Sequence, residues 1–304
     1  MNSGTTITAG IDGSRASLDA ADWAAREAGR RRLPLRLLHA GTRHRVSARV
    51  PDVDVPAGCT RTTLDRAAIQ LSYAHPALDI VARDTETPAV PALIAAAAES
   101  ETLVVGTRGR TGHSALAGFL AGSVALTVAS GATCPVVLVR AGELPEDERE
   151  FTPGRTPMSA ASYRPVVLGL DLKHPADDLI GHAFDTAVVR SAPLLVVHAW
   201  TPPPLHGRAP ADRSVNAPSP GGAHDRGTGR RRALTGTLRP WRDKFPGAPV
   251  AEQVVHGHAG DQLLRASTGA GLLIVGRRAG GRLGRAARSV IRQVTCPVVV
   301  VPYG

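Results

Sequence analysis

Short apolar runs alternate with longer alanine-rich segments along the first half of the chain. Runs such as LRLLHA, TLVVG and PVVLV are apolar at nearly every position, which is typical of strands that are covered on both faces. The alternation predicts, in order, strand 5–11, helix 16–31, strand 34–40, helix 60–73, strand 78–83, helix 88–99, strand 102–106, helix 114–130 and strand 135–139. This order indicates an α/β fold, a doubly wound domain with a parallel five-stranded sheet and helices on both faces.

The second half of the chain repeats the first. Four segments recur in the same order: AGIDGS and LGLDLK, LRLLHA and LLVVHA, TLVVGTRG and LLIVGRRA, TCPVVLV and TCPVVVV. We therefore predict two tandem domains, residues 1–141 and 164–304, joined by a linker at 142–163. The second copy is longer in its middle, where residues 201–229 are rich in proline and glycine and are expected to form a loop.

The final strand of each copy is short, rich in branched residues and expected at a sheet edge. Pro135 and Pro297 stand at the starts of these strands, where a missing N–H is tolerated. Because the unpaired backbone groups of an open edge strand can bond another strand, we expect the two final strands to pair with each other or with a second chain. Pairing with a second copy of the chain would give a homodimer.

A glycine-rich segment, VVGTRGRTGHSALAGFLAGSV, occupies residues 104–124, between an apolar strand and a helix. Glycine permits a positive φ, expected at Gly122, and lets backbone N–H groups approach a ligand closely. The helix that starts near Gly122 and Ser123 would favour phosphate through its free N–H groups and its dipole. Arg108 and Arg110 could neutralise the charge of a bound anion. The alternative is a flexible turn without a ligand.

At these residues the chain resembles the universal stress protein family in its tandem-domain form. The family's ATP-binding pattern, Gly-x2-Gly-x9-Gly-Ser/Thr, fits Gly109, Gly112, Gly122 and Ser123. In the family the first glycine usually ends the fourth strand, and that position is held here by Gly106. Counted from Gly106, the loop is three residues longer than the family pattern.

The resemblance also assigns residues of the first strands. It implies that Asp12, with Gly10 beside it, touches the nucleotide and that the backbone of Ala40 meets adenine. From the residues alone, Asp12 or Ser14 could instead cap the following helix. The histidine before Ala40, His39, is expected to be a packed residue, as is its counterpart in the second copy.

The second copy keeps less of the pattern. Its segment GRRAGGRLGRAARSV, residues 276–290, has no Gly-x9-Gly-Ser, and Gly284 and Arg285 stand where the first copy has Gly122 and Ser123. We therefore expect the nucleotide to bind mainly in the first domain, which alone would have an intact phosphate-binding helix start. Several arginines could share one helix face and attract phosphates or an acidic partner, or form a solvated face: Arg282, Arg285, Arg288 and Arg292.

The composition of the chain limits the cellular location and the binding partners that can be expected. The formal net charge of +10 favours anionic partners, although a solvated basic surface is the simpler interpretation. No apolar run approaches membrane-spanning length, and no secretory signal is recognisable, so we expect a cytoplasmic protein without a membrane partner. The three cysteines lie far apart and fit neither a disulfide framework nor a metal site, and His256 and His258 have no clear third ligand nearby.

No catalytic motif is recognisable, since Gly-x-Ser-x-Gly, His-Glu-x-x-His and Walker A sequences are absent. We therefore assign no catalytic residue and do not expect an enzyme, while slow ATP hydrolysis stays open. The leading hypothesis is an ATP-binding regulatory protein of the stress response with an unknown protein partner. The alternatives are a nucleotide-free module of the same fold that docks an acidic partner and an adenylyl-transfer enzyme; nucleic acid is not an expected partner.

Overall fold

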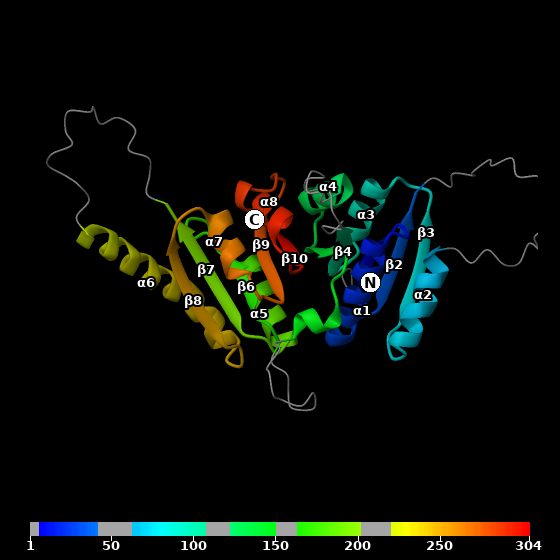
Figure 1. Cartoon of the computed structure of the whole chain (residues 1–304), viewed down its shortest axis with the longest axis horizontal. Coiled ribbons are helices and arrows are strands. Elements are labelled where there is room, and N and C mark those ends of the chain that lie inside the picture. Colours follow the sequence, from blue (N-terminus) through cyan, green and yellow to red (C-terminus); the bar gives the residue numbers. More distant parts are fainter. Residues whose placement is uncertain (1–5, 42–62, 108–121, 150–162, 202–219) are drawn as a thin grey trace, which may run out of the picture. The chain divides into compact units, whose positions relative to one another are not determined.

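The computed structural model describes residues 6–41, 63–107, 122–149, 163–201 and 220–304. The chain forms two compact units, each built from alternating strands and helices (Figure 1). Most of the first unit comes from Met1–Glu146, and most of the second from Asp147–Arg278 and Leu283–Cys296. Three short pieces complete them: Ala279–Arg282 and Pro297–Pro302 in the first unit, and Tyr303–Gly304 in the second.

The first unit is a doubly wound domain with the strand order β3-β2-β1-β4-β5, all parallel. Its strands are β1 (Ile7–Ile11), β2 (Leu35–Ala40), β3 (Ile80–Thr85), β4 (Thr102–Thr107) and β5 (Val136–Arg140). Its helices are α1 (Arg15–Arg31), α2 (Thr63–Ala74), α3 (Ala89–Ala97) and α4 (Ser123–Gly131). A short 3-10 helix, Pro145–Glu148, follows β5.

The second unit repeats this architecture with the parallel strand order β9-β6-β7-β8. Its strands are β6 (Val166–Gly169), β7 (Leu194–Trp200), β8 (Val250–His256) and β9 (Leu272–Arg278). Its helices are α5 (Asp177–Val189), α6 (Pro220–Lys244), α7 (Ala259–Ala266) and α8 (Arg285–Gln293). The predicted fold class, two tandem doubly wound α/β domains, is confirmed. Of the helices that the structure describes, none combines the length and the hydropathy that a membrane span requires.

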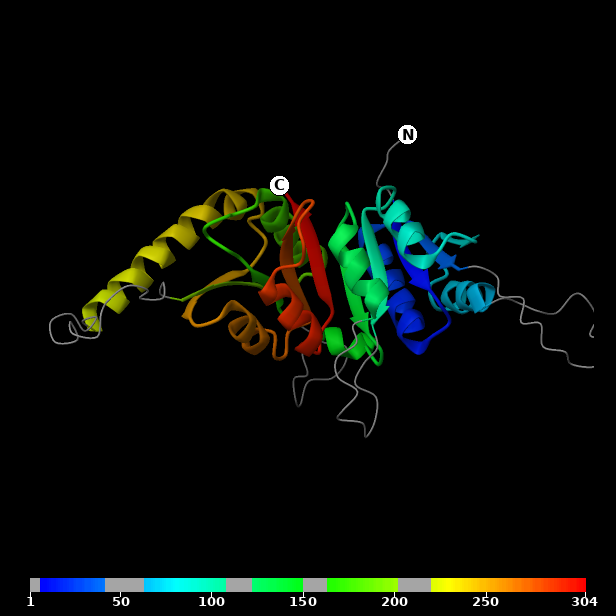
Figure 2. The same ribbon diagram turned by 90° about the horizontal axis from the view of Figure 1, so that it is seen from above.

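Helix α6 corrects one prediction from the sequence. The helix, yellow in Figure 2, begins at Pro220, so the loop expected over 201–229 is wrong for 220–229. Residues 202–219 lie outside the described part of the chain. Leu234 and Leu238, one helical turn apart, are fully buried, and α6 packs against β8. Burial of this apolar face stabilises the helix although its first turns are rich in glycine.

The last strand of the chain, β10 (Val298–Tyr303), adds an antiparallel strand to the sheet of the first unit, where its residues up to Pro302 belong. Val299 lies opposite Val137 of β5, and Val298 lies opposite Leu138. The expectation that the two final strands pair with each other is confirmed. The pairing covers the edge of β5 with a second branched strand.

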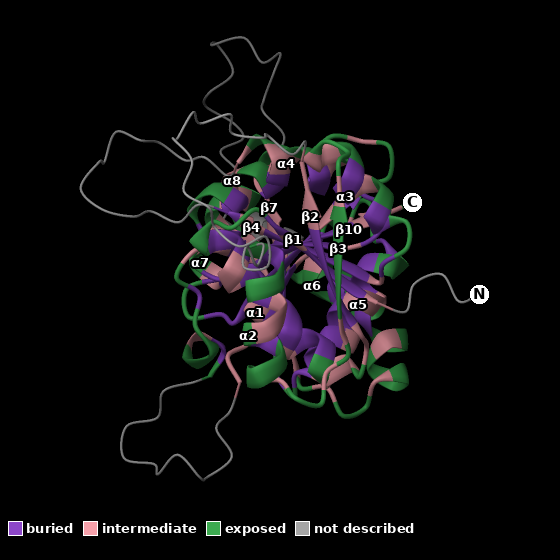
Figure 3. Ribbon diagram, turned by 90° about the vertical axis from the view of Figure 1, so that its right-hand side faces the viewer, coloured by how far each residue is buried: buried purple, intermediate pink, exposed green. Residues whose placement is uncertain are grey.

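Small residues let α1 pack closely onto the first sheet. Ser14 is the N-cap of this helix, and its hydroxyl accepts a hydrogen bond from the Ser17 amide. Ala20, Ala24 and Ala28 repeat at helical spacing and are fully buried. Figure 3 shows the same trend throughout the molecule, with buried residues gathered in the strands and on helix faces. The core is therefore made of alanine against branched strand residues, as the low aromatic content requires.

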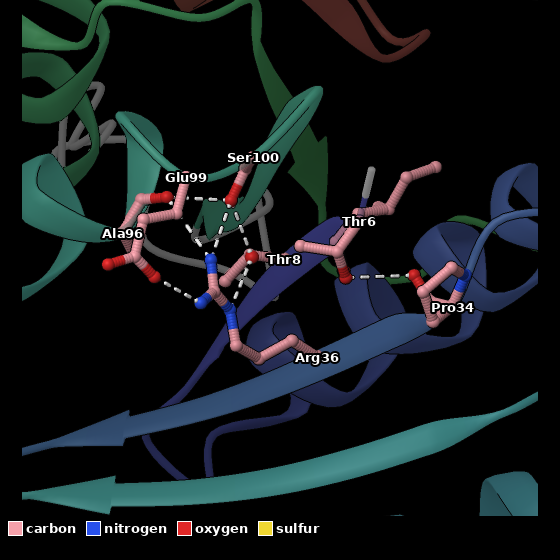
Figure 4. A network of polar contacts seen from close by, with 8 residues as sticks. Thr6, Thr8, Pro34, Arg36, Ala96, Glu99 and Ser100 are labelled. Carbon is pink, nitrogen blue, oxygen red and sulfur yellow. Dashed lines mark hydrogen bonds and ion pairs between the residues drawn. The ribbon is translucent and has the colours of Figure 1, made fainter. Parts of the chain in front are cut away.

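A buried arginine lies near the amino ends of the first strands (Figure 4). Arg36 of β2 is 8% exposed, and its Nε donates to the Thr8 hydroxyl at 2.9 Å. Its two terminal nitrogens donate to a Glu99 carboxylate oxygen at 2.7 Å, to the Ser100 hydroxyl at 3.0 Å and to the Ala96 carbonyl at 3.2 Å. These bonds fix the end of α3 to β1 and β2. The run LRLLHA is thus not uniformly apolar in its contacts.

Candidate functional site

The first unit contains a cavity of about 370 Å³ at the carboxyl ends of its central strands. The strand order reverses direction between β1 and β4, and ligands of doubly wound sheets bind at this switch point. Elements β1, β2, β4 and the starts of α1, α3 and α4 supply the walls. Six residues proposed from the sequence line the cavity together: Gly10, Asp12, Ala40, Gly106, Gly122 and Ser123. The other three, Arg108, Gly109 and Gly112, lie outside the described residues.

Asp12 follows β1 and faces the cavity with one engaged oxygen. Its Oδ1 accepts hydrogen bonds from the Ser14 amide at 2.9 Å and from the Ser14 hydroxyl at 2.6 Å. The Asp12 amide donates to the Ser17 hydroxyl at 3.3 Å. Both of these bonds to the carboxylate engage Oδ1, so Oδ2 is the oxygen that a ligand in the cavity could bond. Of the two capping alternatives, Ser14 is the N-cap of α1, and Asp12 orients it.

The hydrogen bonds around Asp12 also set its charge. Partial burial raises the pKa of this carboxyl. Hydrogen bonds from the hydroxyl and amide of Ser14 lower it, with smaller contributions from the Ser17 hydroxyl and the Asp12 amide, and together they exceed the effect of burial. The pKa therefore lies below its ordinary value. Asp12 is ionised at neutral pH and presents a hydrogen-bond acceptor to the cavity.

The start of α4 presents backbone donors to the same cavity. Gly122 is the N-cap and makes no side-chain capping bond, and the next three residues, 123–125, line the cavity. The N–H groups of a first helical turn have no partner within the helix, and the dipole there favours an anion. The positive φ expected at Gly122 is wrong, since its φ is −52°. A Cβ at this position would meet no protein atom within 4 Å.

Gly106 has a packing role that the glycine pattern does not reveal. A Cβ on this residue would lie 2.3 Å from the carbonyl oxygen of Ala16 and 2.7 Å from the amide nitrogen of Ser17. Both atoms belong to the backbone of α1, so only glycine lets this helix approach β4 as closely as it does. Gly106 thus shapes the cavity by placing the start of α1, which carries Ser17 beside Asp12.

The two strand-end histidines differ in surroundings. His39, expected to be packed, has a side chain that is 37% exposed, with Nδ1 2.9 Å from Asp84 Oδ1. It does not line the first-unit cavity. His198 of the second unit is buried and lines a larger cavity there, of about 1090 Å³. The expectation of a packed residue is therefore right for His198 and wrong for His39.

The second unit keeps a helix start at its cavity. Gly284 is the N-cap of α8, with a φ of −63° and no side-chain capping bond, and it lines the cavity with Ala286 and Ala287. This geometry matches that of Gly122 and α4. The expectation that only the first copy has an intact helix start is wrong, because the residues lost from the second copy precede the helix and leave its first turn in place.

Metal ligands and reactive thiols are not features of the described parts of either unit. Within those residues, no three histidine, cysteine or acidic side chains gather as a metal site would require. Cys134 and Cys296 are buried, and Cys59 lies outside the described residues. Burial raises the pKa of Cys134 to about 11, which keeps its thiol protonated at neutral pH.

The doubly wound fold and the cavity at its switch point define an α/β protein with a candidate ligand site at the carboxyl edge of its sheet. The model of the "Universal stress protein family" matches residues 5–140 and 162–302, so the chain belongs to this family. Universal stress protein Rv2623 of Mycobacterium tuberculosis is 29% identical over 318 residues, which cover 98% of this chain and 97% of that protein.

Solved structures agree with the tandem fold. A universal stress protein from Archaeoglobus fulgidus has a TM-score of 0.61 at 16% identity and covers 99% of both chains. A shorter universal stress protein from the same organism, solved in complex with dAMP, covers 46% of this chain at 21% identity with a TM-score of 0.32. The first of these matches extends over both units and supports the duplicated architecture.

Proposed function

We propose that this chain is an ATP-binding regulatory protein of the stress response and that its first unit holds the nucleotide. The observation that carries the proposal is the position of the α4 start, whose uncapped N–H groups line the same cavity as the ionised carboxylate of Asp12. The N–H groups of α4 suit a phosphate, and the carboxylate of Asp12 suits a ribose hydroxyl. The cavity volume of about 370 Å³ falls within the range of small-molecule sites.

The walls of the cavity suit the remaining part of the nucleotide. Leu38, Leu93 and Val105 supply apolar surface for a base, and the backbone of Ala40 at the end of β2 can bond its edge. The absence of a Cβ at Gly10 leaves room for Leu93, since a Cβ there would lie 3.0 Å from a Leu93 methyl carbon. When bound, ATP would supply its phosphates as a charge signal that a protein partner can read. The residues around the cavity bind and orient it.

Calorimetric titration with ATP tests the proposal. Gly122→Val places a branched side chain at the uncapped helix start, where no protein atom lies within 4 Å of the new Cβ and the φ is ordinary, so the fold should survive. We expect the affinity for ATP to fall at least about tenfold, because the N–H groups of α4 are then screened from phosphate. Gly284→Val makes the same change at α8 and serves as the matched control, with first-unit binding unchanged. Unaltered affinity in Gly122→Val would refute the proposed phosphate site.

A nucleotide-free module that docks an acidic partner is the second candidate. It is favoured by Arg285, Arg288 and Arg292, which lie exposed on α8 without an ion pair to any described residue. Absence of ATP binding to the purified wild-type chain would favour this candidate over the first.

A further inference from the structure

Helix α6 of the second unit differs from its counterpart in the first. α6 and α2 each connect the second and third strands of their unit, but α6 has 25 residues and α2 has 12. The charged residues of α2 are Asp65 and Arg66, whereas α6 carries seven basic and two acidic residues. The imbalance extends to the whole second copy, since residues 164–304 contain 19 arginines and lysines and 9 acidic residues, against 15 and 12 in residues 1–141. The second unit thus has a long basic helix where the first has a short, nearly neutral one.

Three arginines of α6 lie on its outer face. The inner face is formed by Leu234 and Leu238, which are fully buried, and the helix packs against β8 (Figure 1). Arg231, Arg232 and Arg239 are exposed. Because about 3.6 residues make one turn, these three side chains lie within about 100° of the helix circumference. No described residue forms an ion pair or a hydrogen bond with their guanidinium groups. We refer to these three residues as the α6 arginine face.

The same helix already binds one carboxylate of this chain, that of Glu252 on β8. Its Oε1 accepts a hydrogen bond from a terminal nitrogen of Arg242 at 2.8 Å, and its Oε2 lies 2.6 Å from the Thr235 hydroxyl. The same nitrogen of Arg242 donates to the Val250 carbonyl at 3.2 Å, which helps to hold the guanidinium in place. Charge-assisted bonds between arginine and carboxylate are short and strong. The exposed side of α6 is thus already a carboxylate-binding surface, and the α6 arginine face extends it with donors that no described residue engages.

The surroundings of the α6 arginine face distinguish between the anionic partners it could bind. A helix that binds a membrane surface buries apolar side chains in the lipid, and proteins that bind single-stranded nucleic acid stack bases on aromatic rings. Among the described residues, the exposed large hydrophobic side chains lie elsewhere than on α6: Tyr73, Val81, Leu144 and Val188. The apolar face of α6 is occupied by β8. The exposed face therefore offers charge and hydrogen bonds, which suit the carboxylates of another protein.

We propose that the α6 arginine face docks an acidic segment of a partner protein, with a carboxylate paired to each guanidinium. The helical rise places Arg231 and Arg239 about 12 Å apart along the axis, so the segment presents several acidic side chains over about that distance. This surface is separate from the arginines of α8 and from the residues that line the two cavities. The inference rests on the proposed function only in assuming a protein partner, whose chemistry it specifies, and it does not require ATP to bind.

Fluorescence anisotropy of the full chain with a labelled peptide of alternating glutamate and alanine tests the proposal. A matched peptide with glutamine in place of glutamate keeps the length and removes the charge. We expect the acidic peptide to bind, the glutamine peptide not to bind, and added salt to weaken the complex. A variant that combines Arg231→Gln, Arg232→Gln and Arg239→Gln should bind the acidic peptide at least about tenfold more weakly, because three exposed ion pairs are lost together.

A second triple variant is the matched control for net charge. It combines Arg66→Gln, Arg265→Gln and Arg278→Gln, which remove the same charge from exposed positions outside α6. Its affinity for the acidic peptide should stay within about twofold of wild type. Glutamine is a good helix former, so both triple variants should keep the wild-type circular dichroism spectrum. Gly122→Val should bind the peptide as the wild type does, which separates this docking from ATP binding in the first unit.

The outcomes that overturn the proposal are specific. They are failure of the wild type to bind the acidic peptide, equal binding of the glutamine peptide, and an equal loss of affinity in the two triple variants. A DNA duplex or phosphatidylserine vesicles might be bound instead of a protein. If either binds more tightly than the peptide and loses affinity in the α6 variant, the face serves phosphate groups and the acidic-protein partner is wrong.

Discussion

The substitution Gly106→Ala measures how tightly α1 is packed onto β4. The added Cβ would lie 2.3 Å from the Ala16 carbonyl oxygen, 2.4 Å from the Ala16 carbonyl carbon and 2.7 Å from the Ser17 amide nitrogen. All three are backbone atoms, so the clash cannot be relieved by turning a side chain. The start of α1 must shift as a unit, which strains its packing against the strands of the sheet.

Overpacking of this kind costs about 3 kcal/mol, at the upper end of the usual range, because the contacts are much shorter than any real Cβ tolerates. For a domain of this size the midpoint of thermal unfolding should fall by about 10 °C. The ATP affinity proposed for the first unit should fall as well, since α1 carries Ser17, whose hydroxyl accepts a hydrogen bond from the Asp12 amide.

Two control variants make the comparison sharp. Gly122→Ala adds the same methyl group where no protein atom lies within 4 Å, and its stability should stay within about 0.5 kcal/mol of wild type. At Gly276, the second-unit counterpart, the new Cβ would meet side-chain atoms of Tyr303 and Leu179 at 2.6 and 2.8 Å, which can move, so a smaller loss of about 1 kcal/mol is expected. Differential scanning calorimetry of the three variants provides the measurement. A Gly106→Ala protein that melts within about 2 °C of wild type would refute the packing argument.

Three other substitutions test the polar contacts of the first unit. Arg36→Met should lower the free energy of unfolding, measured in urea, by about 2 kcal/mol, because several buried hydrogen bonds are lost. Glu99→Gln should change it by less than about 0.5 kcal/mol, because the Glu99 side chain is 66% exposed. Equal losses in the two variants would contradict the role assigned to the buried bonds of Arg36. Ser14→Ala should cost about 1 kcal/mol at neutral pH through loss of the helix cap. It should also raise the pKa of Asp12 in an NMR titration, because the hydroxyl donor that lowers this pKa is removed. Because the pKa of Asp12 is lower in the folded than in the unfolded chain, its ionised carboxylate stabilises the fold at a pH above the unfolded-state pKa. This stabilisation is lost as the pH falls through the folded-state pKa, so the difference in stability between Ser14→Ala and wild type should narrow in acid. A gap that stays constant with pH would show that Asp12 plays no part.

Much of the fold follows from local patterns. The apolar runs predicted the strands of the first unit to within two residues, and the alanine-rich segments predicted α1, α2 and α3 nearly as well. Periodicity reports burial directly, and a parallel sheet between helix layers imposes the clearest periodicity. Helix α6 escaped prediction because Pro220 and the glycines of its first turns indicate a loop, and because its stability depends on packing against β8, which lies later in the chain.

The candidate site was predictable in its location but not in its contacts. Gly122 was proposed from an expected helix start, which is a local feature, whereas the role of Asp12 was implied by the resemblance to the family. The clash that fixes Gly106 involves α1, ninety residues earlier, and Arg36 reaches across more than sixty residues to Ser100. Such contacts depend on tertiary approach, which periodicity does not encode.

The pairing of β10 with β5 has a consequence for how the protein is made. A ribosome releases Val136 to Arg140 long before it has synthesised Val298. During that interval the nascent first unit can form its five parallel strands, but the outer edge of β5 has no β10 to cover it. An exposed branched edge is prone to join other chains. Once it is synthesised, β10 covers the edge of β5 that stays open during translation of the second unit.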